Sequence, residues 1–356
     1  MTQTNTLKLG DMPRPEHPRP ILTRPEWLNL NGAWSFKADP DQIGQAQGWS
    51  TALPAPDVIM VPFAPGTQAS GAPCPDGCLS VWYERIIPES PWRSEETLLH
   101  IGAADHTTTI WINGHQVAHH RGGYSPITTN IQPFLGATQN RIVIRVNDTT
   151  SWQQPRGKQA GDTRWPIDYD PIIGIWQTVW LEPVPAVRVT QVHYRFDLAE
   201  QCLTVITQLS KHSEAEIEIA VQQPNGQPLR VRGSAKGRSA LTQTLQISMP
   251  RLWHPQDPYL YSVSIRLLTN EIETDRVESY TGLRSLSVAD DQILLNGEPI
   301  YLRGVLDQGY FPEGWYTATT DNALKQDVEL TLAMGFNLAR KHQKFEDPRY
   351  LYWADR

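Results

Sequence analysis

The sequence has 356 residues, more than the roughly 250–300 at which a single hydrophobic core stops growing, so we expect two or three domains. Charged residues make up 19%, and no run approaches the ~18 consecutive apolar residues of a membrane span, so the membrane is not an expected partner. The net charge of -7 disfavours nucleic acid as a partner, because domains that bind it concentrate Lys and Arg.

The first twenty residues contain no apolar segment that could act as a signal peptide, so a cytoplasmic protein is expected. Three cysteines are too few for a disulfide framework, and Cys74 and Cys78 lack the further ligands of a zinc site. We therefore expect no metal and no cofactor. The 29 prolines favour a loop-rich β protein, whereas the 13 tryptophans could either stack on sugars or fill β-sandwich cores.

After an N-terminal extension over residues 1–22, the pattern over residues 23–185 is one of short strands broken by Pro and Gly. This pattern is typical of an all-β sandwich. Its clearest hairpin turns at Asn113-Gly114, where both residues can adopt the positive φ angles of a type I′ turn. A second β region over residues 186–285 has about seven short alternating strands, the size of an immunoglobulin-like sandwich.

The pattern changes again over residues 286–356. A hairpin at Asn296-Gly297 leads into an apolar strand, and Asp321 is expected to cap a helix that Gly335 ends. A strand over residues 336–340 follows, and Asp347-Pro348 opens another helix. Strand, helix, strand, helix is the repeat of a parallel α/β fold, commonly a (β/α)8 TIM barrel.

The length of this last region predicts an incomplete barrel. Only 64 residues follow residue 292, whereas such a barrel takes ~250 residues. We therefore expect the truncated start of a barrel, consisting of its first two β/α units.

This order of domains resembles glycoside hydrolase family 2, which includes β-galactosidases, β-glucuronidases and β-mannosidases. Local strings agree with that resemblance along nearly the whole chain. In the first region, which resembles the family's sugar-binding jelly roll, they are residues 30–36 (LNGAWSF), 81–85 (VWYER), 110–114 (IWING), 120–124 (HRGGY), 140–145 (NRIVIR) and 174–180 (GIWQTVW). In the later regions they are residues 252–261 (LWHPQDPYLY), 282–284 (GLR), 295–300 (LNGEPI), 303–305 (RGV), 335–337 (GFN) and 340–342 (RKH).

The resemblance implies a retaining β-glycosidase that hydrolyses O-glycosidic bonds with two glutamates on later barrel strands, the acid/base one following an Asn. Such a pair lies about 5–5.5 Å apart. We expect both after Arg356, so this chain should contain no catalytic residue and be inactive alone. Its Asn270-Glu271 pair is expected to form a solvated turn. A carbohydrate substrate is expected, and a homo-oligomer of the full-length protein stays open.

Four residues remain as candidates for substrate binding. Asp307 would end the first barrel strand, where active-site groups of such barrels lie, or it could be a solvated loop carboxylate. Arg340 and His342 match the family's Arg-His segment, in which the cation would orient the nucleophilic carboxylate. Lys341 and Lys344 are expected to be solvated neighbours.

The fourth candidate, Asp168, lies in a segment that the resemblance directs into the barrel mouth, with Asp170 as its competitor. Ordinary loop capping is the alternative for both. Trp165 could stack on a sugar there or pack in the core.

Two other classes of protein stay open. One is a non-catalytic carbohydrate-binding protein that uses the two sandwiches alone, and the other is a purely structural or interaction module. The sequence does not indicate which sugar is bound.

Overall fold

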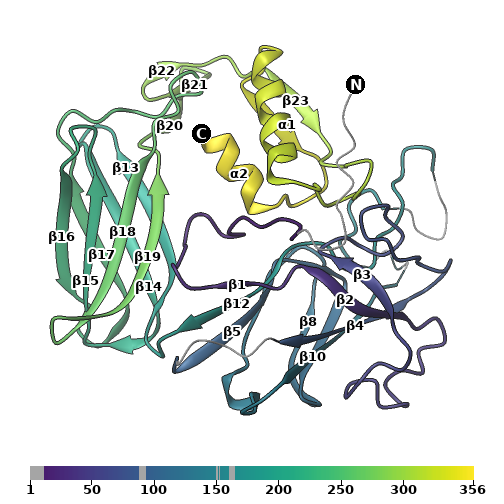
Figure 1. Ribbon diagram of the computed structural model, residues 1–356. Coiled ribbons are helices and arrows are strands. Elements are labelled where there is room, and N and C mark those ends of the chain that lie inside the picture. Colours follow the sequence, from purple (N-terminus) through teal and green to yellow (C-terminus); the bar gives the residue numbers. More distant parts are fainter. Residues whose placement is uncertain (1–11, 88–93, 150, 152, 160–164) are drawn as a thin grey trace.

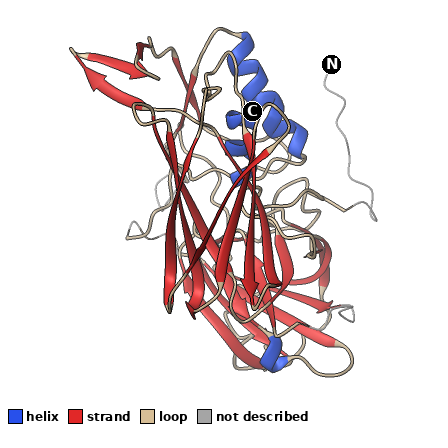
Figure 2. Ribbon diagram, turned by 90° about the vertical axis from the view of Figure 1, so that its left-hand side faces the viewer, coloured by secondary structure: helices blue, strands red, loops and turns tan. Residues whose placement is uncertain are grey.

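The computed structural model describes residues 12–87, 94–149, 151, 153–159 and 165–356. Two β-sandwiches and a segment with two α-helices make up this part of the chain (Figure 1). The helices α1 and α2 lie together at one end of the molecule, and strands occupy most of the rest (Figure 2). No helix among the described residues is both long and apolar enough to span a membrane.

The first sandwich packs a four-stranded sheet on a six-stranded sheet, with a short two-stranded ladder beside them. The four-stranded sheet has the order β1 (Leu28–Asn29), β12 (Val179–Val184), β5 (Glu96–Ile101) and β9 (Ile127–Asn130). The six-stranded sheet has the order β3 (Asp57–Val61), β2 (Gly32–Ala38), β4 (Ser80–Ile87), β10 (Asn140–Asn147), β7 (Thr107–Ile112) and β8 (His115–Arg121). The ladder pairs β11 (Gly174–Ile175) with β6 (Ala104–Asp105), and a 3-10 helix spans Gln132–Phe134.

The core of this sandwich comes from strand residues that alternate inward, as a two-sheet packing requires. Trp34, Tyr83 and Ile110 belong to it and are at most 1% exposed. The predicted hairpin between β7 and β8 is confirmed, with φ angles of 50° at Asn113 and 82° at Gly114.

The second sandwich packs three strands on four around Leu203, Ile217 and Tyr261, all of which are fully buried. Its first sheet has the order β13 (Val189–Asp197), β14 (Cys202–Ser213) and β17 (Arg238–Gln246). Its second sheet has the order β16 (Pro228–Ser234), β15 (Glu216–Gln222), β18 (Tyr261–Thr269) and β19 (Ile272–Thr281). Asn270 and Glu271 form the β18–β19 turn and are exposed, as predicted.

The C-terminal segment starts with a small antiparallel sheet of β20 (Leu286–Ala289), β21 (Gln292–Leu295) and β22 (Glu298–Pro299). It continues as β23 (Gly304–Asp307), α1 (Asp321–Ala333), β24 (Leu338–Lys341) and α2 (Pro348–Asp355). β23 and β24 pair in parallel, with α1 as the crossover between them. The predicted strand–helix–strand–helix order is therefore present.

One predicted helix cap is wrong by a residue. The N-cap of α1 is Thr320, whose hydroxyl accepts a hydrogen bond from the Ala323 N–H, and Asp321 is already helical. The Asp321 carboxylate instead accepts two hydrogen bonds from Arg349 on α2, at 2.8 and 2.7 Å. The cap of α2 is as predicted, because Asp347 accepts from the Arg349 N–H and Pro348 takes the first helical position.

The N-terminal segment, residues 12–27, joins the two sandwiches through the buried carboxylate of Glu182 on β12. Its oxygens lie 3.0 Å from Arg19, 3.3 Å from Arg24 and 3.2 Å from the His100 ring. Burial alone would raise the pKa of Glu182, but His100 and the two arginines hold it well below its ordinary value. Arg24 also pairs with Asp275 on β19, so it joins the two sandwiches.

Replacing the carboxylate of Glu182 by an amide tests how much this cluster stabilises the fold. Glu182→Gln leaves Arg19 without its counter-charge and Arg24 with Asp275 alone, so the free energy of unfolding should fall by about 3 kcal/mol. Chemical denaturation followed by tryptophan fluorescence measures this. Asp257→Asn, which breaks an exposed pair with Arg251, is the matched control. A loss for Glu182→Gln no larger than that of the control would refute this role.

Candidate active site

The carboxyl ends of β23 and β24 bring together three of the four predicted binding residues. Leu306 pairs with Arg340 and Asp307 with Lys341 in the parallel ladder. The His342 N–H donates to the Asp307 carbonyl at 2.8 Å, which extends the pairing by one residue. Parallel strands end at the same edge of a sheet, so Asp307, Arg340 and His342 become neighbours although 33 positions separate the first two in the sequence.

Arg340 on β24 and His342, one residue after its end, share the face that points away from the helices. Ala339 packs in the apolar cluster beneath α1 and α2, and the Lys341 ammonium lies 3.8 Å from the centroid of the Tyr350 ring on α2. Successive strand residues point to opposite faces, so Arg340 and His342 occupy the other one. Arg340 is exposed, and its guanidinium lies 3.3 Å from Nδ1 of His342.

Asp307 lies at the same edge, but its carboxylate already has protein partners. Oδ2 accepts from the Lys341 ammonium at 2.7 Å, and Oδ1 accepts from the Gly309 N–H at 2.8 Å. Burial alone would raise the pKa of Asp307, but the Lys341 ammonium, the Gly309 N–H and the Tyr350 hydroxyl together hold it below its ordinary value. Asp307 is thus a fixed, ionised group and not a solvated loop carboxylate.

The prediction that Lys341 and Lys344 are solvated neighbours is wrong. The Lys344 side chain is 1% exposed, and that of Lys341 is 12% exposed. Both cations bond to the buried carboxylate of Glu346. The sequence held only a weak sign of this arrangement, the opposite charges at Lys344 and Glu346 directly after a strand.

The loop with Asp168 comes from the first sandwich and lies beside the end of β23. The rings of Tyr169 and Tyr310 are 4.4 Å apart, and the Lys158 ammonium lies 3.5 Å from the Gln308 side-chain oxygen. Gly157 has a φ of 58°, and a Cβ there would lie 2.3 Å from the Gln343 carbonyl oxygen. The close approach between the loop with Asp168 and the loop after β24 therefore depends on glycine at position 157.

Within this loop Asp168 caps its own turn. Its Oδ2 accepts from the Trp165 N–H at 2.7 Å, while the Asp168 N–H donates to the Trp165 carbonyl. Asp170 is half-buried, like Asp168. Trp165 is 62% exposed, so it does not pack in the core. The turn that Asp168 closes thus presents an open indole face.

Sequence reasoning missed Asp105, a carboxyl buried at the base of this loop. It is 2% exposed, and its Oδ2 accepts from the Gln159 side chain at 2.8 Å. Among the described residues, its Oδ1 has no hydrogen-bond partner. Burial, reinforced by the nearby Asp148, raises the pKa of Asp105 to about 7. A lone Asp in a strand gives no sequence signal for such burial.

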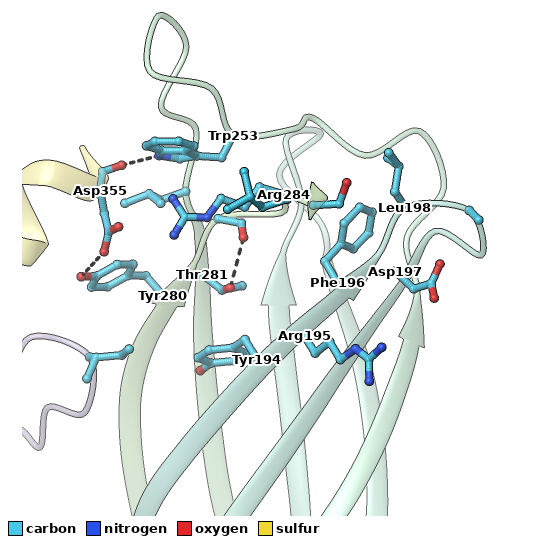
Figure 3. Close-up of a pocket in the computed structure, with 16 residues that line it drawn as sticks. Tyr194, Arg195, Phe196, Asp197, Leu198, Trp253, Tyr280, Thr281, Arg284 and Asp355 are labelled. Atoms are coloured by element: carbon cyan, nitrogen blue, oxygen red, sulfur yellow. Dashed lines mark hydrogen bonds between the residues drawn. The ribbon is translucent and has the colours of Figure 1, made fainter. Parts of the chain in front are cut away.

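A cavity of about 660 Å³ lies elsewhere, between the second sandwich and the end of α2 (Figure 3). None of the four predicted binding residues lines it. Its polar groups bond to one another, since the Trp253 indole N–H donates to the Asp355 carbonyl and the Tyr280 hydroxyl donates to the Asp355 carboxylate. Arg284 stacks over the Trp253 ring at 4.8 Å. These contacts join the second sandwich to the end of α2, so we interpret the cavity as part of a structural interface.

Over the residues that the structure describes, no three His, Cys, Asp or Glu side chains are grouped so that they could hold a metal ion. The strand edge thus presents a cation, Arg340, and an imidazole, His342, to the exposed face. The adjoining loop with Asp168 adds aromatic and carboxylate groups beside them.

Two family models match the chain. The one described as "Glycosyl hydrolases family 2, sugar binding domain" matches residues 28–185. The one described as "Glycosyl hydrolases family 2" matches residues 187–284. Together they account for more than two thirds of the sequence.

Among known proteins the chain is similar to a β-glucuronidase of Paenibacillus borealis, with 31% identity over 306 residues that cover 81% of this chain and 50% of the relative. A β-galactosidase of Thermoanaerobacter pseudethanolicus is 25% identical over 273 residues, which cover 73% of this chain and 36% of that protein. The chain thus spans half or less of the length of these relatives.

Among solved structures, the chain resembles the β-glucuronidase of Ruminococcus gnavus. The TM-score is 0.80 at 24% identity, and the match covers 93% of this chain and 57% of that one. Identity this low establishes a shared fold and nothing more.

The buried carboxyl of Asp105 predicts an unusual pH dependence of stability. Its folded-state pKa of about 7 lies above its ordinary value of 3.8, so between these pH values the folded state holds a proton that the unfolded state has lost. Its contribution to the free energy of unfolding should be complete below about pH 4 and fall as pH rises towards 7, by on the order of 1.4 kcal/mol for each pH unit crossed.

Asp105→Asn removes this titration. The difference in unfolding free energy between the variant and the wild type should therefore grow in favour of the variant from pH 4 to pH 7, as measured by urea denaturation. Asp257→Asn is the control, because the bond from Arg251 lowers the pKa of Asp257 and any effect has the opposite sign. A difference that does not change with pH would contradict the prediction.

Proposed function

The chain belongs to glycosyl hydrolase family 2, and from this premise we propose that it is the N-terminal portion of a retaining β-glycosidase. Such an enzyme hydrolyses the O-glycosidic bond of a β-glycoside in carbohydrate metabolism. The observation that carries the proposal is the pairing of Arg340 and His342 on the open face of β24, beside a loop from the sugar-binding domain.

We propose that β23, α1, β24 and α2 are the first two units of a (β/α)8 barrel. Their parallel pairing and alternating order support this, and in such barrels active-site groups sit at the carboxyl ends of the strands. The face of β24 with Arg340 would then point into the barrel. Its exposed apolar neighbours Leu306 and Leu338 support the same orientation, because the interior of a complete barrel is filled with such side chains.

A retaining mechanism requires two carboxyl groups about 5–5.5 Å apart, one as the nucleophile and one that acts first as acid and then as base. In our proposal both are glutamates on later strands, outside these 356 residues. Arg340 would orient the nucleophile and keep it ionised, because a cation within about 4–6 Å favours the charged form of a carboxyl group. His342, held beside it, would contact the sugar or that carboxylate.

The other two candidates take different roles in this proposal. Asp307 keeps spare lone pairs for a sugar hydroxyl, but its bonds to Lys341 and Gly309 favour a supporting role at the strand end. Asp168 closes the turn that presents Trp165, whose exposed ring could stack on a sugar or on its leaving group.

The relatives support a class of substrate but not a particular sugar. A β-glucuronidase and a β-galactosidase are both among them, which supports a β-glycoside with either a uronic acid or a neutral sugar. The exposed Trp165 also keeps the second candidate function, sugar binding without catalysis, open to test.

The proposal predicts that the 356-residue chain hydrolyses no aryl β-glycoside. A panel that includes β-glucuronide, β-galactoside and β-mannoside tests this, together with sequencing of the reading frame beyond codon 356, which should encode Asn-Glu and a second Glu. Appreciable hydrolysis by the chain alone would sink the truncated-enzyme proposal. Tight sugar binding by the two sandwiches combined with a stop codon there would favour the non-catalytic function.

A second prediction concerns Arg340. In the protein extended along its reading frame, Arg340→Met should lower kcat by about 100-fold, a typical loss when a group that stabilises active-site charge is removed. Arg303→Met is the matched control, because Arg303 is an exposed arginine just before the opposite end of the same parallel sheet. Equal effects of the two substitutions on kcat would show that Arg340 has no special role.

A further inference from the structure

Lys344 is a buried cation at the boundary between the first sandwich and the β/α segment. Its Nζ donates to the Gly309 carbonyl at 2.6 Å and to the Tyr316 carbonyl at 2.8 Å, and it lies 3.0 Å from a Glu346 oxygen. The centroid of the Tyr316 ring is 5.1 Å away. Burial lowers the pKa of Lys344, and the Glu346 carboxylate acts in the opposite direction.

Glu346 links this cation to the strand ends. Its side chain is 3% exposed and bonds Lys341 at 2.9 Å as well as Lys344, and Lys341 in turn bonds Asp307. Burial alone would raise the pKa of Glu346, but the two lysines hold it below its ordinary value. Two cations and two carboxylates thus alternate, so each buried charge has a counter-charge.

The two carbonyls that Lys344 binds belong to the loop between β23 and α1. Near its start, a Cβ on Gly309, whose φ is 60°, would lie 2.2 Å from a Glu346 oxygen, so a larger residue there would displace that carboxylate. Near its end, the Tyr316 ring packs 5.6 Å from that of Trp176 in the first sandwich, and the Thr317 hydroxyl donates to the Trp176 carbonyl. The Lys344 ammonium group therefore binds both the start and the end of the loop between β23 and α1, and this loop packs on the first sandwich.

We propose that Lys344 is a positioning residue for the reaction at the carboxyl ends of β23 and β24. Its ammonium group fixes the loop after β23, the loop after β24 and the adjoining sandwich in one arrangement, and this sets where Arg340 and His342 stand relative to the sugar-binding domain. The inference rests on the proposed function. Lys344 does not touch substrate, because its side chain is almost fully buried.

A lysine suits this place for a geometric reason. Its ammonium group has three N–H donors and no acceptor, which matches two carbonyls and one carboxylate. Methionine is a long side chain without the charge, so Lys344→Met removes the bonds while filling much of the space. That substitution also leaves Glu346 with one cation fewer, which destabilises the fold for reasons unrelated to positioning.

The test therefore compares Lys344→Met with the double variant Lys344→Met/Glu346→Gln, in which the buried charges balance again. Lys325→Met, on the exposed face of α1, is the matched control. In the protein extended along its reading frame, Lys344→Met should lower kcat at least tenfold and change KM much less. The double variant should regain most of the lost Tm but not kcat. Recovery of kcat together with Tm would overturn the proposal, because it would show a merely structural role.

Hydrogen exchange on the 356-residue chain provides a readout that does not need catalysis. The Phe311 and Trp315 amides bond to each other's carbonyls within the fastened loop. Their exchange should be at least tenfold faster in Lys344→Met and in the double variant than in the wild type or Lys325→Met. Unchanged exchange would overturn the proposal even if the wild-type enzyme is active. Faster exchange in a protein whose extended form hydrolyses no glycoside would instead disprove the proposed function alone.

Discussion

The buried carboxylate of Glu182 is the interaction on which the arrangement of this molecule depends. It is fully inaccessible and gathers His100 from its own sandwich with Arg19 and Arg24 from the N-terminal segment. A buried carboxylate is tolerable only when its charge is compensated and its lone pairs are bonded. Arg19, Arg24 and His100 supply these partners, and the two arginines hold the N-terminal segment against the first sandwich.

The N-terminal segment also binds the second sandwich and the β/α segment. Arg24 makes two hydrogen bonds to Asp275 in the second sandwich, each of 2.9 Å. Arg14, which is 2% exposed, pairs with Asp347, the N-cap of α2. Arginine suits both places because it stays charged, and the planar fork of Arg24 binds both oxygens of Asp275. Residues 12–27, the described part of the N-terminal segment, thus hold the three parts of the chain together, and Figure 1 shows them running between the helices and β1.

The candidate site is built from two parts of the chain that these contacts hold together. Its strand edge belongs to the β/α segment, whereas the loop with Asp168 belongs to the first sandwich, and neither has the site's full set of groups. The aromatic contact of Tyr169 with Tyr310 and the buried charges around Lys344 fix the loop and the strand ends relative to each other. In our proposal, sugar binding therefore depends on the contacts between the two domains as well as on the residues that face the site.

The sequence by itself determined the local elements and the family. The Asn113-Gly114 turn, the glycine at the end of α1 and the Asp347-Pro348 helix start follow from backbone preferences of single residues, which neighbours far along the chain do not alter. The predicted order of elements placed Asp307 at the end of the first strand of the C-terminal region, and the parallel pairing in the structure brings Arg340 and His342 beside it. The burial of Lys344, Glu346 and Asp105, and the fastening of the N-terminal segment, were decided only in the tertiary structure. Lys344 binds the carbonyls of Gly309 and Tyr316, and Asp105 binds Gln159, all of them tens of positions away. Because these partners are distant in the sequence, the nearby opposite charges of Lys344 and Glu346 do not by themselves predict burial.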